Sequence, residues 1–176
     1  ISWFYPTIGS NGVITNYVKF NVVLNAWDYG ALGRTAWINQ SVFGNPIGAG
    51  EDGFIYQHEI GNDAGDLPMD SYFQTGYFQI GEGEYKIFLD QVWPDFKYGL
   101  YGGPQSANLK LTFYVTNYPG DEPKPYGPFI MNVHKQYLTP RFRGRLVSVK
   151  VESTDAASFW RIGAMRYRAT PDGKFG

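Results

Sequence analysis

Apolar and polar positions alternate with a period of two along much of the chain, a pattern typical of β-strands that bury one face. The clearest case is segment 109–115, where Leu109, Leu111, Phe113 and Val115 share one face and polar or amphipathic side chains occupy the other. Helical spacing at i, i+3, i+4 and i+7 is nowhere sustained over about 11 residues without a Gly or Pro. The pattern therefore predicts an all-β protein.

The first part of the chain has the strand content of one β-propeller blade. Four short strands are expected there: 1–5, 16–24, 35–39 and 53–58, with turns at 9–12 and 29–33. A single blade cannot bury both faces of its sheet and needs neighbouring blades. We therefore expect residues 1–61 to be a propeller-like blade, completed by another chain or by a preceding segment. The start on Ile1, without an initiator Met, indicates truncation or cleavage.

The rest of the chain predicts a second β unit. Residues 62–70 are polar and rich in turn formers, as expected of a linker. The spacing of the strands that follow favours an antiparallel β-sandwich over residues 71–176. Six strands are expected in it: 71–80, 84–93, 108–116, 126–133, 142–152 and 159–169.

Three arginines introduce the fifth of these strands. In a regular strand, Arg141, Arg143 and Arg145 would lie on the same face as the valines that follow, which would mix charge with core. We expect a β-bulge at Gly144 to shift the phase, so that the arginines face solvent or a partner while the valines stay buried. Guanidinium groups at this spacing suit carboxylates of another subunit better than nucleic acid, because no recognition helix or zinc finger accompanies them.

Composition favours contacts between chains. Five Trp, 14 Tyr and 13 Phe are more aromatic residues than a small core can hide, so some should lie at interfaces. The formal net charge is only −1, but residues 51–95 hold ten acids and one base, whereas 141–176 hold eight bases and three acids. An acidic face of one copy can therefore meet a basic face of another. The absence of Cys excludes disulfides and thiolate metal sites.

Catalytic chemistry is poorly represented. The chain has two histidines, His58 and His134, without a paired metal spacing, and it contains no nucleophile elbow or phosphate-binding loop. Glu82 and Glu84 are typical of an exposed hairpin turn rather than of a glycosidase pair. Asp63, Asp66 and Asp70 lack the order of a calcium loop, although a calcium site stays an alternative. We predict no enzyme activity, no cofactor and no metal.

Several short motifs resemble, in order and spacing, the C-terminal part of tail nozzle or packaged-DNA-stabilisation (head-completion) hub proteins of short-tailed bacteriophages. In the first 50 residues they are WFYP (3–6), NAWDYG (25–30) and RTAW (34–37). Later motifs are IYQHEIG (55–61), GYFQIG (76–81), WPDF (93–96), YP (118–119), GPF (127–129), RFRGR (141–145), WRIG (160–163) and PDG (171–173). The family pattern often continues PDG with two arginines, from which Lys174, Phe175 and Gly176 depart.

This resemblance implies a structural virion protein of the phage tail. Such a chain would form a ring with other copies of itself, close the portal channel and help to retain packaged DNA. Portal or adaptor proteins, tail fibre proteins and non-specific contact with DNA are the other implied partners, and no membrane is involved. The candidate interface residues are Arg141, Arg143, Arg145, Trp160 and Arg161.

A receptor-recognition module that binds carbohydrate is the alternative function. Its aromatic platform would be Trp93, Tyr98 and Tyr101, which surround a Gly-rich segment.

Overall fold

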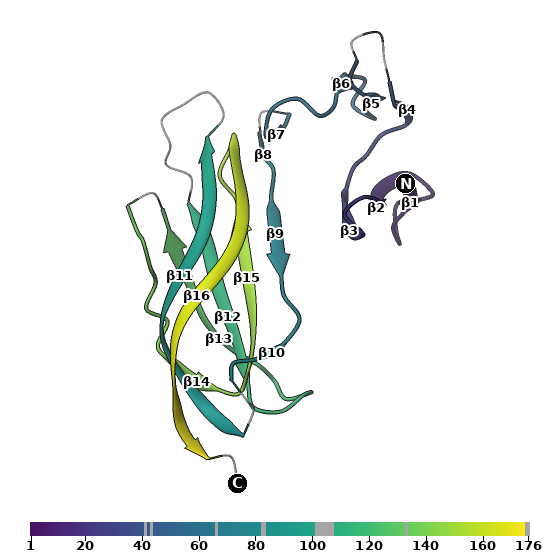
Figure 1. Cartoon of the computed structure of the whole chain (residues 1–176). Helices are drawn as coiled ribbons and strands as arrows, with labels where there is room; N and C mark the ends of the chain where they lie inside the picture. Colours follow the sequence, from purple (N-terminus) through teal and green to yellow (C-terminus); the bar gives the residue numbers. More distant parts are fainter. Residues whose placement is uncertain are drawn as a thin grey trace. The chain divides into compact units, whose positions relative to one another are not determined.

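The computed structural model consists of antiparallel β-sheets joined by turns, with no helix in the described part of the chain (Figure 1). The structure describes residues 1–40, 42, 44–65, 67–81, 84–100, 108–132 and 134–174. The predicted all-β class is confirmed. The chain divides into two compact units, Ile1–Ile60 (unit 1) and Gly61–Gly176 (unit 2).

Unit 1 contains two three-stranded sheets, with the orders β1-β2-β3 and β4-β5-β6. Their strands are β1 Ser2–Pro6, β2 Ile14–Asn21, β3 Ala26–Ala31, β4 Ala36–Ile38, β5 Ile47–Ala49 and β6 Ile55–Gln57. The four predicted strands therefore do not form one four-stranded blade, and within the described residues no hydrogen-bonded ladder joins the two sheets. Strands β3 and β5 were not predicted.

The hairpin between β2 and β3 explains part of this difference. The Asn21 side-chain carbonyl accepts hydrogen bonds from the backbone N–H groups of Val23 and Leu24, each at 3.1 Å, and this turn ends β2 earlier than predicted. Asn25 completes the turn with a φ of 49°. The predicted turn at 29–33 is partly strand, because Gly30 lets β3 pass under the Tyr17 ring, 2.9 Å from where a Cβ would lie.

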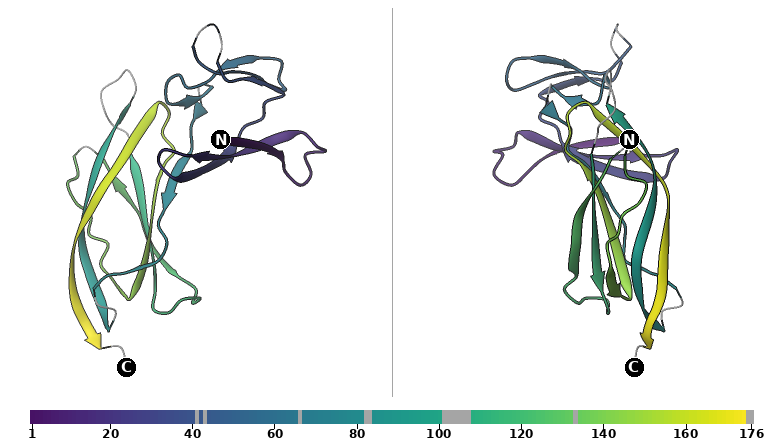
Figure 2. Two further views of the ribbon diagram at one scale, coloured as in Figure 1. Left: turned by 45° about the vertical axis from the view of Figure 1, so that its right-hand side comes forward. Right: turned by 90° about the vertical axis from the view of Figure 1, so that its left-hand side faces the viewer.

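Unit 2 is a β-sandwich, as predicted. One sheet has the order β10-β15-β12-β13, with β9 also paired to β15, and the other has the order β14-β11-β16. Figure 2 shows β11 and β16 in one layer and β12 and β13 in the facing layer. The strands are β9 Ser71–Gln74, β10 Phe78–Gln79, β11 Tyr85–Leu100, β12 Leu109–Thr116, β13 Lys124–Met131, β14 Phe142–Gly144, β15 Leu146–Ser153 and β16 Ser158–Lys174.

Both sheets contribute to one sealed core. The predicted alternation in β12 is confirmed, since its four apolar side chains are at most 5% exposed. They meet apolar side chains from the facing sheet and from the other strands of their own. The buried members are Ile80, Ile87, Leu89, Val92, Leu109, Leu111, Phe113, Val115, Met131, Leu138, Phe142, Val147, Val149 and Val151.

The chain changes sheet at Arg145. β14 pairs with β11 and ends at Gly144, whereas β15 begins at Leu146 and pairs with β12. The predicted bulge in one continuous strand is therefore wrong. Gly144 is required for a different reason: a Cβ there would lie 2.1 Å from Val115 Cγ1, so only glycine lets the chain cross so close to β12.

The predicted linker contains structure of its own. β7 Asp63–Ala64 and β8 Leu67–Pro68 form a short hairpin that belongs to unit 2. The Asp63 carboxylate accepts a hydrogen bond from the backbone N–H of Ala157, just before β16. This contact fixes the hairpin to unit 2, so the segment is not a free tether.

Candidate interaction surfaces

The sequence-predicted candidate metal ligands are not brought together in the described part of the chain. They contain no group of three or more His, Asp or Glu side chains that could hold a metal ion. Of the predicted calcium ligands, Asp63 is engaged with Ala157, Asp70 is exposed, and Asp66 lies outside the described residues. Glu82 also lies outside them, while Glu84 is exposed.

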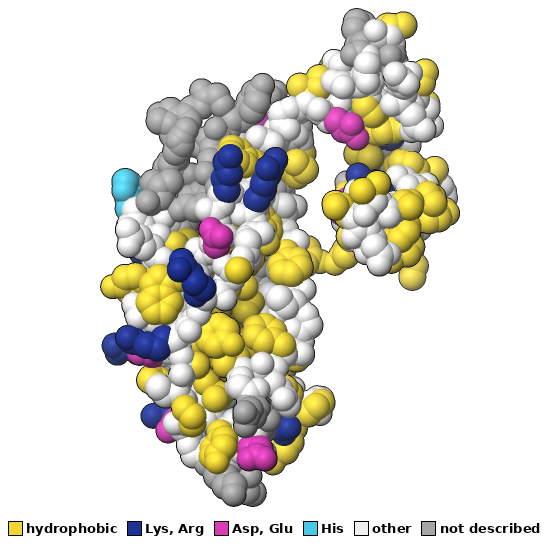
Figure 3. Space-filling model, viewed as in Figure 1, with side chains coloured by type: hydrophobic (Ala, Val, Ile, Leu, Met, Phe, Trp, Pro, Cys, Tyr) yellow, Lys and Arg dark blue, Asp and Glu magenta, His cyan; other side chains and the backbone are white. Residues whose placement is uncertain are grey.

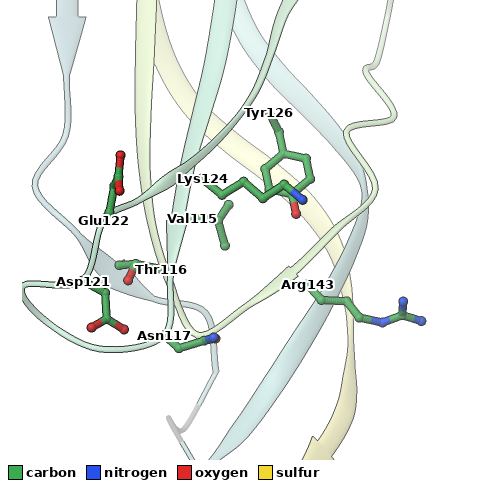
Figure 4. Close-up of a pocket in the computed structure, with 8 residues that line it drawn as sticks. All are labelled: Val115, Thr116, Asn117, Asp121, Glu122, Lys124, Tyr126 and Arg143. Atoms are coloured by element: carbon green, nitrogen blue, oxygen red, sulfur yellow. The ribbon is translucent and has the colours of Figure 1, made fainter.

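A pocket of about 210 Å³ opens beside β12 and β14 (Figure 4). Carboxylates of Asp121 and Glu122 and the basic side chains of Lys124 and Arg143 line it. The Arg143 guanidinium points away from the other labelled side chains in Figure 4, and its Nε donates to the Asp172 carboxylate. The lining thus combines acidic and basic side chains.

His58 belongs to a polar and aromatic cluster in unit 1. Arg34 Nε donates to His58 Nε2 at 3.0 Å, and the rings of Trp37 and His58 lie 4.5 Å apart. Burial, together with the nearby Arg34 charge, lowers the pKa of His58. A neutral imidazole is needed to accept the Arg34 hydrogen bond, so the lowered pKa and the geometry agree. His58 is thus a local packing residue at the end of β6.

The same cluster holds Asp52 and Tyr56. The Tyr56 hydroxyl donates to the Asp52 carboxylate, which lowers the pKa of Asp52 and raises that of Tyr56. The Arg34 guanidinium lies over the Tyr56 ring, 4.1 Å from its centroid. These contacts join β4 and β6 mainly through polar side chains, and backbone hydrogen bonds join both strands to β5.

The sheet β1-β2-β3 has one mainly apolar face, interrupted by Asn16, which lies opposite Tyr5 and Ala31. Its register places Trp3, Val18 and Tyr29 in one row across the three strands, and Phe20 and Trp27 in the next. Trp27 stacks between its neighbours, with ring centroids 6.0 Å from Trp3 and 4.8 Å from Phe20. We call this the aromatic face; its members are Ile1, Trp3, Tyr5, Val18, Phe20, Trp27 and Tyr29.

The aromatic face is poorly covered. Trp27 and Tyr29 are each 64% exposed, and Trp3 is 47% exposed. Among the described residues of unit 1, no large hydrophobic side chain reaches the burial of the unit 2 core. The described residues of unit 1 therefore leave much of this apolar side exposed, which is an unusual state for an isolated sheet.

The predicted arginine triplet is split by the sheet change. Arg141 and Arg143 are exposed, whereas Arg145 is half-buried at the crossover, where its backbone N–H donates to the Thr116 carbonyl. Arg143 is paired with Asp172, and its guanidinium lies 5.1 Å from the centroid of the Phe88 ring. The predicted burial of the valines is confirmed, with Val147, Val149 and Val151 at most 3% exposed.

The other predicted interface residues lie far from this triplet. Arg143 is opposite Phe88 on β11, whereas Arg161 is opposite Lys97, nine positions along the same strand. At roughly 3.3 Å per residue this separation is about 30 Å. Trp160 packs against the core, and its indole N–H donates to the Ser71 hydroxyl at 2.9 Å. Trp160 is therefore a structural residue, and Arg161 alone remains available at that end.

The predicted sugar platform is only partly placed. Tyr101 and the side chain of Tyr98 lie outside the described residues. Trp93 is half-buried, and the Tyr137 ring lies 6.2 Å from it at 48°. Two rings at this angle do not form one flat surface on which a sugar ring could stack.

Basic side chains gather on the face over β11 and β16 that points away from the core (Figure 3). Cross-strand neighbours on this face are Lys97 with Arg161, and Trp93 with Arg166. Farther along, Arg168 forms two hydrogen bonds with Asp90, and these lower the pKa of Asp90. We call this the basic ribbon face; its members are Asp90, Trp93, Asp95, Lys97, Arg161, Arg166 and Arg168.

Sequence reasoning missed Lys97, Arg166 and Arg168 as surface candidates. The excess of bases in 141–176 was a usable signal, but only the register of β11 against β16 shows which of them share a face with Lys97.

Comparison of the chain with protein-family models found no family that matches, and comparison with curated proteins found no relative. No helix in the described part of the chain has the length and apolar character needed to cross a bilayer.

Proposed function

We propose that this chain is a structural subunit that assembles with other copies of itself, and that the aromatic face of unit 1 is its principal assembly contact. The observation behind the proposal is the combination of a mainly apolar, exposed sheet face with the absence of a comparably sealed core in the described residues of unit 1. Large aromatic side chains at such exposure are typical of interfaces that form between chains.

The size of the aromatic face suits this role. If a large side chain offers about 150–250 Å² of surface, the exposed fractions of its members amount to roughly 600 Å² of apolar area. A stable protein interface buries about 800 Å² on each partner, and its centre is the most apolar and aromatic part. The aromatic face is therefore large enough to form the centre of an interface, with polar neighbours as its rim.

The biological setting of the proposal is the tail of a short-tailed bacteriophage. There the subunits would form a nozzle or hub ring that helps close the portal and retain packaged DNA, in contact with portal or adaptor and tail fibre proteins. The sequence motifs support this setting, and the all-β architecture is compatible with it. Neither the assembly role nor the setting requires a reaction or a cofactor.

Analytical ultracentrifugation of the intact chain over a range of concentrations tests the assembly role. We expect wild-type protein to self-associate, and the double variant W27S/Y29S to remain monomeric. The matched control is Y77S, because Tyr77 is 48% exposed and belongs to unit 2, not to the aromatic face.

A wild-type monomer at all concentrations would contradict the assembly proposal. Specific binding to a glycan array, lost in W93A but retained in W27S/Y29S, would instead favour the carbohydrate-binding alternative.

A further inference from the structure

The basic ribbon face contains three cations that form no ion pair with any side chain in the described part of the chain. Lys97, Arg161 and Arg166 are exposed, and none of them forms an ion pair with a described residue. Arg168 on the same face differs, because the Asp90 carboxylate neutralises its charge in a bidentate ion pair. The unpaired charge is thus confined to one end of the ribbon.

The arrangement of Lys97 and Arg161 is unfavourable in the isolated chain. They are directly opposite each other in an antiparallel pair, and like charges in this position repel. Asp95 supplies one carboxylate nearby: it lies over Gly163, where an added Cβ would be 3.0 Å from Asp95 Oδ2. One carboxylate among three cations leaves an excess of positive charge, which an incoming anionic group would relieve.

Unit 1 has exposed carboxylates that likewise form no ion pair with a described residue. Glu51 lies in the turn between β5 and β6, and Glu59 lies just beyond β6; both are exposed, and neither forms an ion pair with a described residue. The other acids of unit 1 are already engaged, Asp28 with Tyr17 and Lys19, and Asp52 with Tyr56. The side chains of unit 1 carry a net charge of −2, from two bases and four acids.

We propose that the basic ribbon face, through Lys97, Arg161 and Arg166, docks the free carboxylates Glu51 and Glu59 of unit 1 of a second copy of this chain. The inference rests on the proposed self-assembly and names the polar contact that accompanies it. Charge complementarity favours this occupant over nucleic acid, because Asp90 and Asp95 interrupt the basic stripe where a continuous phosphate backbone would have to pass.

Such a contact is head-to-tail, since each copy uses unit 1 against unit 2 of the next. Repetition of a heterologous contact produces a closed ring when the rotation between copies allows closure, and an open filament otherwise. The contact involves exposed ion pairs, so it should set orientation and respond to salt more than it adds affinity.

A charge-reversal experiment on the intact chain tests the docking. K97E/R161E makes the ribbon acidic, and E51K/E59K makes the corresponding part of unit 1 basic. Each variant alone should self-associate about tenfold more weakly than wild type, since two attractive pairs become repulsive. An equimolar mixture should regain wild-type association, because opposite charges then face each other at every contact. K124E is the matched control, because Lys124 is exposed on β13 in the other sheet, and it should associate like wild type.

Sedimentation equilibrium measures association, and thermal melting by circular dichroism verifies that each variant is folded. Wild-type association by K97E/R161E, or a mixture that fails to recover, overturns the docking while leaving the aromatic-face proposal intact. A wild-type monomer overturns both. Fluorescence anisotropy with a short DNA duplex completes the test: DNA binding that K97E/R161E loses, with self-association unchanged, assigns the face to nucleic acid and overturns the proposal.

Discussion

Unit 1 and unit 2 are both made of antiparallel strands, but they differ in the burial of their apolar side chains: unit 2 buries them in a core, whereas unit 1 leaves many of its large ones exposed. Unit 2 has two sheets that face each other, and its central strand β12 is sealed, with Leu109 and Leu111 fully buried. Unit 1 also has two sheets, but the strands of the second are three residues long and the aromatic face of the first is left open.

The contrast teaches that strand content alone does not create a core. A sheet is stabilised by the layer that covers its apolar face, and unit 1 has the face without the layer. Its internal order depends instead on turns and on polar contacts such as that between Arg34 and His58. We therefore expect the stability of the two units to respond very differently to equivalent substitutions.

The largest difference is expected from a buried charge. Val151 is fully buried, so Val151→Asp should destabilise unit 2 by more than about 4 kcal/mol and unfold it. Trp27→Asp places the same charge on the aromatic face, where water can solvate it, and should leave unit 2 folded. Near-ultraviolet circular dichroism during urea denaturation measures both, and an equal loss of structure in the two variants would contradict the contrast.

A smaller effect is expected at the sheet crossover. Gly144→Ala adds a Cβ against Val115, and we expect a loss of about 1–3 kcal/mol in the unfolding free energy of unit 2. Gly76→Ala is the matched control, because the space around that position is open. Thermal denaturation compares the two, and equal midpoints would show that the close approach is relieved at no cost.

The Trp160 indole offers a finer probe of unit 2. Trp160→Phe keeps most of the apolar contact but removes the donor to Ser71, so we expect a loss of about 0.5–1.5 kcal/mol. If the hydrogen bond causes this loss, Ser71→Ala should cost a similar amount and the double variant little more than either single one. A fully additive double-mutant cycle would assign the effect to packing.

The smallest effect is a dependence of unit 1 on pH. The pKa of folded His58 lies below its ordinary value of 6.5, so the unfolded chain takes up the proton first as the pH falls. The contribution of His58 to stability is therefore complete above pH 6.5 and decreases from that value down to the folded pKa. The fluorescence of Trp37, whose ring is 4.5 Å from His58, reports this step.

In the His58→Gln variant the step in Trp37 fluorescence should vanish. An unchanged titration curve would assign the step to another group; the charged neighbours of His58 are Arg34 and Glu59.

The sequence predicts those parts of the fold that are determined by residues close to one another in the chain. Alternation in 109–115 is a property of neighbouring residues, and the buried side of β12 follows from it. β3 escaped prediction because Asp28 and Gly30 are poor strand formers, and only cross-strand pairing with β2 compensates. The change of sheet at Arg145 left no local signal, because the residues on both sides have strand character.

The candidate surfaces were predictable to different extents. An excess of aromatic residues indicated exposed rings, but their collection on one face depends on the register of β1, β2 and β3. The basic ribbon depends on long-range register as well, since Lys97 and Arg161 are 64 positions apart in the chain. Likewise, only the register of β11 shows that Trp160 and Arg161 lie far along this strand from Arg143.

The position of β11 in its sheet also determines when this sheet can form. Both neighbours of β11 come much later in the chain: Leu100 pairs with Ser158, and Tyr85 pairs with Lys174, so the pairing joins residues 58 to 89 positions apart. Closing loops of this length is slow compared with forming local hairpins. During synthesis the edge of β11 that pairs with β16 therefore stays unpaired until β16 emerges, whereas β14 can pair with the other edge earlier. A nascent chain halted before Ser158 would expose this edge to any strand nearby, so the pairing of β16 with β11 is the step that protects the chain from misassociation.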